Sequence, residues 1–412
     1  MAREGGSVGR AIKIAMIAVM EHLPLQGMRV LALEQMIAAP WATQLLARFG
    51  AEVIKVEHPE RGESGRGSMP AITDPEGRSV GATFLRNNLN KRSVAIDLAR
   101  GSELVLRLAE RCDVFIDNHK AGTLERYGLG YEAVDARNPR IVYASVTGFG
   151  TTTPSPYRDR PAYASVAEAM SGIYEWARTP GQRPNVNPMG AVGDIGSALF
   201  ATIGILTALI DREATGKGQH VDVAMFDAMV SICDVVPSLW SMGARERAPG
   251  AILTAFEAAD GWVIVQVSRE HQFERLASAI GHSEWTADPR FASRQGWVDH
   301  LESDIRPAVE AWMRTMDKDA VCGTLAAAGI PCGPCNSAED VLNDPHLAQR
   351  DMLVQFDEGY VVPGNAIKLS RVDARRDRRA PWLGEDTEDV LMGLLGMSTS
   401  EVAELRRSGI VA

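Results

Sequence analysis

The feature that most constrains the fold is an alternation of short apolar runs with helix-like segments, which begins at residue 28. Residues 28–34 (MRVLALE) and 51–57 (AEVIKVE) are apolar runs of strand length, and residues 40–50 between them start with proline and end with glycine. Proline at the first position and glycine after the last are typical of helix ends. A strand, a helix and a second strand over about 30 residues form a unit whose two strands lie parallel in one sheet.

The same alternation continues along the first half of the chain. Apolar runs recur at residues 93–97, 113–117 and 140–146. This predicts an α/β fold over residues 23–225, with a doubly wound, mostly parallel sheet of Rossmann-like order.

The turn after the first strand argues against dinucleotide binding. Residues 34–40 contain no glycine, whereas a G-x-G-x-x-G loop needs glycines so that the backbone can approach a pyrophosphate. A nicotinamide-dependent dehydrogenase is therefore disfavoured.

The second half of the chain predicts a smaller α+β domain. Two strands joined by the turn Asp260-Gly261 are expected within residues 254–267, and helical segments follow them. We assign residues 226–250 to a linker helix, residues 251–335 to the smaller domain, and residues 336–412 to a C-terminal segment that returns to the large domain.

Residues 1–22 are assigned to an N-terminal extension. Arg3 and Arg10 precede an apolar run at residues 11–20, which is the order found in a signal peptide, but Lys13 interrupts this run. The run is too short to span a bilayer, so no membrane span is predicted, and an interfacial anchor stays as the alternative.

Charge and cysteine content narrow the class of protein. The net charge of −10 argues against nucleic-acid binding and against a polybasic membrane patch. Five cysteines in 412 residues form an odd and sparse set, unlike a secreted disulfide framework. We therefore expect a cytoplasmic protein.

The short motifs in the sequence give little support for metal or redox chemistry. No Walker loop, H-E-x-x-H motif or paired zinc-ligand spacing occurs, so no metal site is predicted. Cys332-Gly-Pro-Cys335 has thioredoxin-like spacing, but such a pair needs its first cysteine at a helix N-terminus, and here the next helix is expected only from Ser337. We interpret the motif as a structural turn.

An acidic residue stands directly before a long apolar run. Asp194 lies between Gly193 and residues 195–210. The simpler interpretation is a helix N-cap. A carboxylate at a helix start also faces backbone N–H groups and a favourable dipole, which would keep it ionised and in position, as an oxygen nucleophile requires. The flanking Gly193 and Gly196 would leave room for a thioester carbonyl.

Two sets of polar residues are candidates for binding phosphate. Asn90-Lys91-Arg92 precedes a predicted strand, and an ion-paired or solvated turn is its simpler interpretation. Asn118 and His119 end a strand at the carboxyl edge of the sheet, where α/β proteins bind ligands, and Arg126 follows closely. The second set is the better candidate.

The chain resembles the type III coenzyme A transferases, the group that contains formyl-CoA and carnitine-CoA transferases, from about Leu25 to Val411. The resemblance rests on short segments in a fixed order, which are LQGMRV at 25–30, AAP at 38–40, AEVIKVE at 51–57, NKRS at 90–93, TGKGQ at 215–219, GIPCGP at 329–334, NDP at 343–345 and APWLGEDT at 380–387.

The resemblance implies a site and an assembly. The nucleophilic aspartate of such enzymes lies in a Gly-Asp pair, which is Asp194 here, and the fold is an interlocked homodimer of two ring-shaped chains. CoA contacts are implied at Ala38, Ile96, Asn118, His119, Arg126 and Met225.

Three positions depart from the pattern of such enzymes. Relatives carry an acid after the tyrosine of a P-x-Y segment, where this chain has Tyr163 followed by Ala164, and Glu168 stands where glutamine is common. We infer that a second carboxylate that could orient the substrate or handle protons is missing, and that racemase activity, which uses a His–Asp pair there, is disfavoured. Formyl-CoA transferases carry glutamine where Ile37 stands. Ile37 and Tyr163 are assigned to the acyl pocket, and an apolar Ile37 suggests an acid larger or less polar than formate or oxalate.

The sequence thus predicts an enzyme that transfers CoA from an acyl-CoA to a free carboxylic acid, through an aspartyl anhydride and an enzyme–CoA thioester, with no resident cofactor. Two alternatives stay open. One is racemisation or isomerisation of an acyl-CoA, and the other is non-catalytic acyl-CoA binding, suggested by the lost acid at Ala164.

Overall fold

The described chain divides into two compact units. The computed structural model describes residues 23–233, 235–245, 250–372 and 377–412, so the predicted extension at residues 1–22 lies outside the described residues. The smaller unit is Gly243–Gln349, and the larger unit contains the chain on both sides of it. The smaller unit is therefore wider than the predicted 251–335, because it takes in the last residues of the predicted linker and the first residues of the predicted C-terminal segment.

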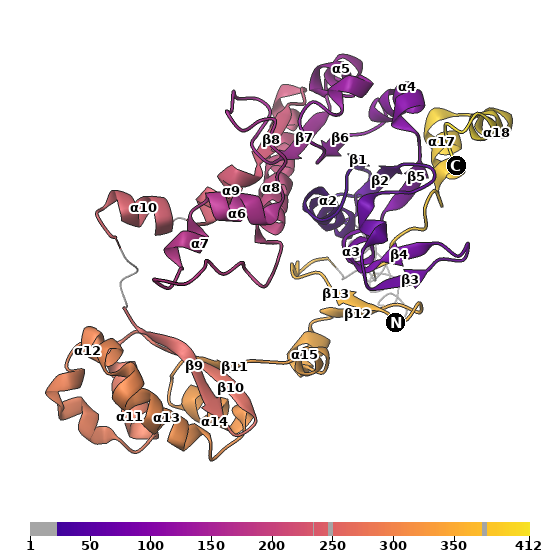
Figure 1. Cartoon of the computed structure of the whole chain (residues 1–412). Helices are drawn as coiled ribbons and strands as arrows, with labels where there is room; N and C mark the ends of the chain where they lie inside the picture. The colour runs from indigo at the N-terminus through magenta and orange to yellow at the C-terminus, as the bar shows by residue number, and fades with distance from the viewer. Residues whose placement is uncertain (1–22, 234, 246–249, 373–376) are drawn as a thin grey trace, which may run out of the picture. The chain divides into compact units, whose positions relative to one another are not determined.

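A six-stranded parallel sheet forms the centre of the larger unit (Figure 1). Its strands are β1 (Arg29–Leu33), β2 (Glu52–Glu57), β5 (Arg92–Ala95), β6 (Val114–Asp117), β7 (Val142–Thr147) and β8 (His220–Ala224). Their spatial order is β5-β2-β1-β6-β7-β8, and every neighbouring pair is parallel. The predicted α/β class with a mostly parallel sheet is confirmed.

Helices cover both faces of this sheet, because its strands are apolar on both sides. Val30 and Ala32 of β1 belong to one core cluster, which includes residues of α2 (Ala38–Arg48), α6 (Ala164–Met170), α8 (Val192–Thr215) and α9 (Met225–Ile232). Leu31 and Leu33 belong to the other cluster, which includes residues of α4 (Leu98–Ala109), α5 (Tyr131–Arg137), α17 (Thr387–Leu395) and α18 (Thr399–Arg407).

Shorter elements connect these layers. They are β3 (Ala71–Thr73), β4 (Ser79–Gly81), α3 (Ala82–Asn87), α7 (Ile173–Trp176), α10 (Val235–Ser241), β12 (Leu353–Gln355) and β13 (Val361–Pro363). In place of one predicted linker helix at 226–250, the structure has the two short helices α9 and α10.

The C-terminal segment closes one edge of the sheet. The Asp386 carboxylate accepts a hydrogen bond from the Ser93 amide at 2.9 Å, and the Thr387 hydroxyl accepts one from the Ala95 amide at 3.1 Å. These side chains satisfy amides of the edge strand β5 that no neighbouring strand reaches, which protects an otherwise open edge.

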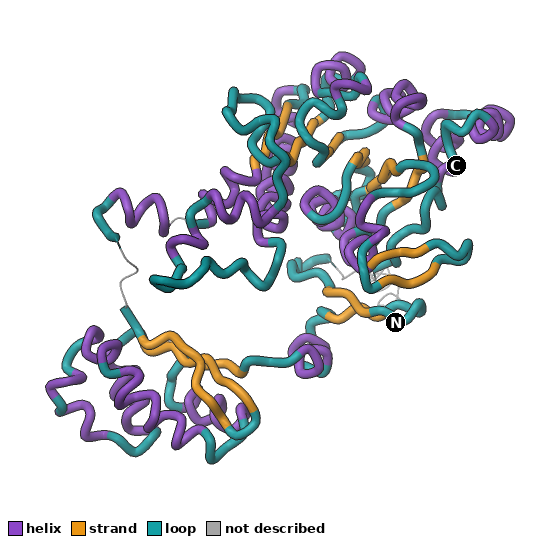
Figure 2. Tube along the Cα trace, in the orientation of Figure 1, coloured by secondary structure: helices purple, strands orange, loops and turns teal. Residues whose placement is uncertain are grey.

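The smaller unit is an antiparallel sheet with helices (Figure 2). Its strands β9 (Ile252–Ala258), β10 (Gly261–Val267) and β11 (Cys332–Pro334) have the order β11-β10-β9. Its helices are α11 (Glu270–Ala279), α12 (Arg294–Asp299), α13 (Arg306–Met313), α14 (Lys318–Ala327), α15 (Ala338–Leu342) and α16 (Pro345–Gln349). The predicted strand pair around Asp260-Gly261 is present, with Gly261 opposite Ala258.

The turn from α8 into β8 contains Gly216 and Gly218, and the second of these positions has no room for a side chain. Gly216 ends α8 with a φ of 73°, as expected of a C-cap. Two residues later the backbone passes close to the start of β7, and a Cβ on Gly218 would lie 1.8 Å from the Ile141 carbonyl oxygen. The contact involves backbone, so it cannot be relieved by a side-chain rotation.

Gly218→Ala is expected to destabilise the protein by about 2 kcal/mol or more, because β7 and β8 must separate to admit the methyl group. The matched control is Gly393→Ala in α17, where a Cβ would meet no other atom within 4 Å and where alanine favours the helix by about 0.5–1 kcal/mol. Urea denaturation of both variants measures the difference, and equal midpoints would contradict the proposed backbone clash.

Candidate active site

A cavity lies at the carboxyl edge of the sheet, where the strand order reverses. From β1 the chain continues toward β2 and β5, whereas β6 leads to β7 and β8. Ligands of open α/β sheets bind at such a point. The cavity of about 670 Å³ is lined by residues that follow β1, β2, β5 and β6, including Gln35, His58, Asp97 and His119. Its size is within the range of small-molecule sites.

The loop after β1 forms one wall of this region and is held in a strained conformation. Met36 has a φ of 62°, a left-handed value that is uncommon for a residue with a side chain. The Asn118 side chain binds both backbone groups of Gln35, at 2.8 Å and 2.9 Å. The Glu63 carboxylate accepts a hydrogen bond from the Met36 amide at 3.0 Å. These contacts fix the backbone that leads into Ile37 and α2.

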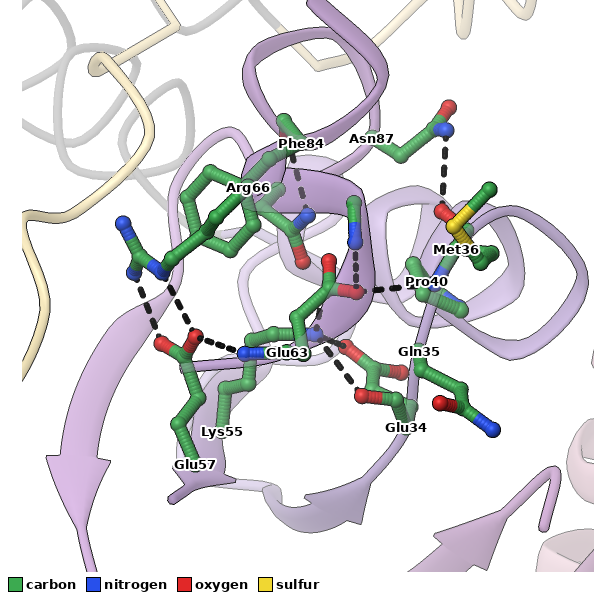
Figure 3. Close-up of polar contacts among 12 residues, drawn as sticks. Glu34, Gln35, Met36, Pro40, Lys55, Glu57, Glu63, Arg66, Phe84 and Asn87 are labelled. Atoms are coloured by element: carbon green, nitrogen blue, oxygen red, sulfur yellow. Dashed lines mark hydrogen bonds and ion pairs between the residues drawn. The ribbon is translucent and has the colours of Figure 1, made fainter. Parts of the chain in front are cut away.

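A buried ionic network lies beneath this loop (Figure 3). The Glu34 carboxylate lies 2.7 Å from Lys91 Nζ and 3.4 Å from Lys55 Nζ, and all three side chains have 0% exposure. Burial disfavours the ionised Glu34, but the two lysines outweigh this effect and lower its pKa. Burial also lowers the pKa of Lys91 to about 7. Lys91 is thus part of an ion-paired turn, which confirms the simpler interpretation of that segment.

Asp194 lies in the first turn of α8 as its third residue, and not at the N-cap, which is Ala191. The two flanking glycines face other helices. A Cβ on Gly193 would lie 3.0 Å from Ala164 Cα, and one on Gly196 would lie 2.4 Å from the Ile232 side chain. The prediction that these glycines leave room for a thioester was therefore wrong, because they allow α6 and α9 to pack closely against α8.

The electrostatics at Asp194 also differ from the prediction. Burial of the carboxyl group, with a contribution from the negative charge of Glu168, raises the pKa of Asp194 to about 6. The helix start therefore does not bring the pKa of Asp194 below its ordinary value, because burial and the charge of Glu168 raise it. No hydrogen bond from the described residues reaches this carboxylate. The carboxylate is half-buried, and with a pKa of about 6 it is still mostly ionised above pH 7.

Glu168 supplies a second carboxylate beside Asp194. It is 2% exposed, and its Oε1 accepts a hydrogen bond from the Gly193 amide at 3.0 Å. Its Oε2 accepts a short hydrogen bond from the Tyr174 hydroxyl. Ala164 itself leaves no acid at its position, but a carboxylate is present four residues later. A residue four positions later lies on the same face of a helix, so the spacing from Ala164 to Glu168 could have indicated it.

Comparison with known proteins decides the family. The profile of CoA-transferase family III matches residues 25–387. The chain belongs to this family. A succinyl-CoA–L-malate CoA-transferase beta subunit of Chloroflexus aurantiacus is 33% identical over 94% of this chain and 98% of the relative. A formyl-CoA:oxalate CoA-transferase of a Bradyrhizobium strain is 34% identical, covering 93% and 96% of the two chains. A crystal structure of a CaiB/BaiF family protein from Brucella suis superposes with a TM-score of 0.81, at 34% identity, over 91% of this chain and 100% of that one.

The predicted resemblance is confirmed, and the chain is an enzyme of the CoA-transferase type. Its predicted CoA-binding residues lie in different settings. Ile96 and His119 line the cavity at the sheet edge. Arg126 is exposed and follows Thr123, which lines the same cavity. The Asn118 side chain holds Gln35, so it positions the loop.

The other predicted residues belong to or directly precede the helices α2, α6 and α9, which pack against α8. Ala38 and Met225 are buried in the same core cluster as Ala164. Ile37 precedes α2, and Tyr163, which is 75% exposed, precedes α6. Asp194 is not among the residues that line the sheet-edge cavity, so within the described chain the predicted site residues fall into two groups.

The surroundings of His119 favour its neutral ring. Burial, together with the nearby Lys55, lowers its pKa below the ordinary value. Its buried Nδ1 has no hydrogen-bond partner among the described residues. The neutral ring can still donate a hydrogen bond to a ligand in the cavity or accept one from it.

The cysteine motif takes no part in this site. Cys332 lies in strand β11, and its thiol donates to the Cys322 carbonyl at 3.5 Å. Burial raises the pKa of Cys332, which disfavours the reactive thiolate. The motif is structural, although it is a strand and not the predicted turn. Among the residues that the structure describes, no group of three His, Cys, Asp or Glu is arranged to bind a metal.

Lys91→Met is expected to destabilise the larger unit by about 3–5 kcal/mol, because it leaves the buried Glu34 charge with only the more distant Lys55. The control Arg137→Met removes a cation that pairs with Glu103 and Glu110 at the surface, and it should leave the unfolding midpoint nearly unchanged. Thermal and urea denaturation measure both. A Lys91→Met midpoint equal to the control would contradict the role of the network.

Proposed function

We propose that this enzyme transfers CoA from an acyl-CoA thioester to a free carboxylic acid, with Asp194 as the nucleophile. The observation that carries this proposal is the Asp194 carboxylate itself. It is half-buried, and no hydrogen bond from the described residues occupies its oxygens. A carboxylate that is partly desolvated and unpaired is more nucleophilic than one in water.

The reaction proceeds in four steps that need no external energy source. An Asp194 oxygen attacks the thioester carbonyl, the C–S bond breaks, and CoA leaves as a thiolate, so that a mixed anhydride remains. The thiolate attacks the Asp194 carbonyl carbon, which gives an enzyme–CoA thioester and the free donor acid. The acceptor carboxylate attacks the carbonyl carbon of that thioester, the C–S bond breaks, and CoA leaves again as a thiolate, so that a new anhydride forms. The thiolate then attacks the acceptor's carbonyl, which yields the new acyl-CoA and restores Asp194.

The two groups of site residues support separate parts of this reaction. We propose that the cavity at Ile96 and His119, with Arg126 at its border, receives the nucleotide portion of CoA. Ala38 and Met225 would contact the thiol end near α8, and Ile37 and Tyr163 would contact the acyl group. The apolar Ile37 favours an acid larger or less polar than oxalate. No resident cofactor is required, because an anhydride and a thioester are similar in energy.

The outer face of α8 supports a homodimer. This helix is long and apolar enough to cross a membrane, but it packs against β7 and β8 as a core helix. Phe200, Ile203 and Ile210 on it are nevertheless 40%, 60% and 76% exposed. Exposed apolar patches of this kind mark interaction surfaces. We propose that a second copy covers them, in the interlocked arrangement that the family resemblance implies, and that the enzyme acts in the cytoplasm.

Asp194→Ala is expected to lower CoA transfer by about 10³-fold or more, because the covalent intermediates can no longer form. Asp211→Ala is the matched control, since Asp211 is an exposed acid in the last turns of the same helix. Both variants should keep the wild-type melting temperature. Transfer is measured by mass spectrometry with a panel of acyl-CoAs and carboxylic acids.

A trapping experiment tests the intermediate directly. The wild-type enzyme is incubated with acyl-CoA alone, quenched in acid and digested, and the peptide that contains Asp194 should carry an acyl or CoA adduct. Undiminished transfer by Asp194→Ala would refute the assignment. Exchange of the substrate α-hydrogen with deuterated water, without transfer, would indicate a racemase or isomerase instead.

A further inference from the structure

We propose that Glu168 is a positioning residue for Asp194: its carboxylate holds the first turn of α8 and places a second negative charge beside the nucleophile, and acylation of Asp194 relieves the repulsion. This inference rests on the proposed function. It concerns a residue at which this chain departs from the pattern of its relatives, since Glu168 stands where they commonly carry glutamine.

Glu168 supplies an acceptor for the backbone at the start of α8. The N-cap residue Ala191 has no side-chain hydrogen bond to the helix, so the first amides of α8 need another acceptor. Glu168, on α6, accepts the hydrogen bond from the Gly193 amide at 3.0 Å. Gly193 is the neighbour of Asp194 in the chain, so the acid of one helix fixes the backbone that carries the nucleophile on another.

Glu168 is itself held in place by hydrogen bonds from neighbouring residues. Its Oε2 accepts a short hydrogen bond from the Tyr174 hydroxyl, and its backbone carbonyl accepts one from the Ser171 hydroxyl at 2.7 Å. The side chain is 2% exposed. A buried acid with both oxygens engaged cannot turn toward water, so its charge stays where the packing of α6, α7 and α8 puts it.

The described residues provide no cation to balance the charges of Glu168 and Asp194. Neither Glu168 nor Asp194 forms an ion pair with any described lysine, arginine or histidine. The charged groups on the neighbouring helices point elsewhere, because Glu175 of α7 pairs with Arg178 at 2.6 Å and Asp227 of α9 is exposed. Two like charges without a cation repel each other and oppose ionisation of the more accessible one. This agrees with the raised pKa of Asp194, to which Glu168 contributes after burial.

Acylation of Asp194 removes its negative charge. The Asp194 carboxylate carries a negative charge, whereas its anhydride and its CoA thioester carry none. Each acylation of Asp194 therefore removes the repulsion from Glu168, and each release restores it. The arrangement favours the acyl-enzyme over the free carboxylate, which lowers the barrier to the first attack.

Glu168→Gln tests the charge separately from the hydrogen bonds. Glutamine has nearly the same shape, and its carbonyl oxygen can still accept from the Gly193 amide. The control Glu175→Gln removes a negative charge from an exposed acid on α7. Protonated Asp194 is labelled with a carbodiimide as a function of pH, and the modified peptide is quantified by mass spectrometry, so that the measurement does not require transfer activity.

In Glu168→Gln the midpoint of Asp194 labelling should fall by about one pH unit, which is about a threefold loss of labelling near pH 5.5. The acid limb of kcat/KM should move down with it, while Glu175→Gln matches the wild type. Tyr174→Phe keeps both carboxylates, so its midpoint should stay near that of the wild type. An unshifted midpoint in folded Glu168→Gln, or an equal fall in Tyr174→Phe, would overturn the inference.

These results are distinct from a failure of the proposed function. If Asp194→Ala retained transfer while Glu168→Gln still shifted the labelling of Asp194, the pairing of the two acids would be upheld and the nucleophile assignment would be lost. If Asp194→Ala lost transfer and Glu168→Gln changed neither labelling nor the pH profile, the nucleophile would stand and the role of Glu168 would be refuted.

Discussion

The larger unit depends on a carboxylate that is ionised where no water reaches it. Glu34 directly follows the central strand β1, and Lys55 of β2 and Lys91, which directly precedes β5, neutralise it. A buried charge of this kind cannot lose a partner without a large cost in stability. The end of β1, the interior of β2 and the start of β5 are therefore tied together, and the loop that follows Glu34 begins from a defined point at the edge of the sheet.

The two acidic sites of this enzyme use opposite electrostatics. Glu34 is surrounded by cations, which lower its pKa, and it has no freedom to react. Asp194 has a second acid beside it, and burial together with that acid raises its pKa. One carboxylate is structural because its charge is balanced, and the other is suited to chemistry because its charge is left unbalanced. Perturbed acids of the second kind are typical of active sites.

The sequence predicted much of the architecture, because the signals for it are local. Apolar runs of strand length, with proline and glycine at helix ends, placed β1, α2 and β2 to within a few residues. It also placed Asp194 at the start of α8, although the residue lies three positions beyond the observed N-cap, Ala191. The glycines beside Asp194 were misinterpreted, because a glycine that admits a ligand and a glycine that admits a neighbouring helix are identical along the chain.

The sequence by itself determined the parallel α/β class, the family and the candidate nucleophile, since these follow from periodicity and from motifs of consecutive residues. Only the tertiary structure decided which groups surround that nucleophile. Glu168 is 26 positions from Asp194 in the chain, and its carboxylate reaches the α8 start only because glycine at 193 lets the two helices approach. The pKa of an acid depends on such distances and on burial, and neither is a property of the residue's neighbours in sequence.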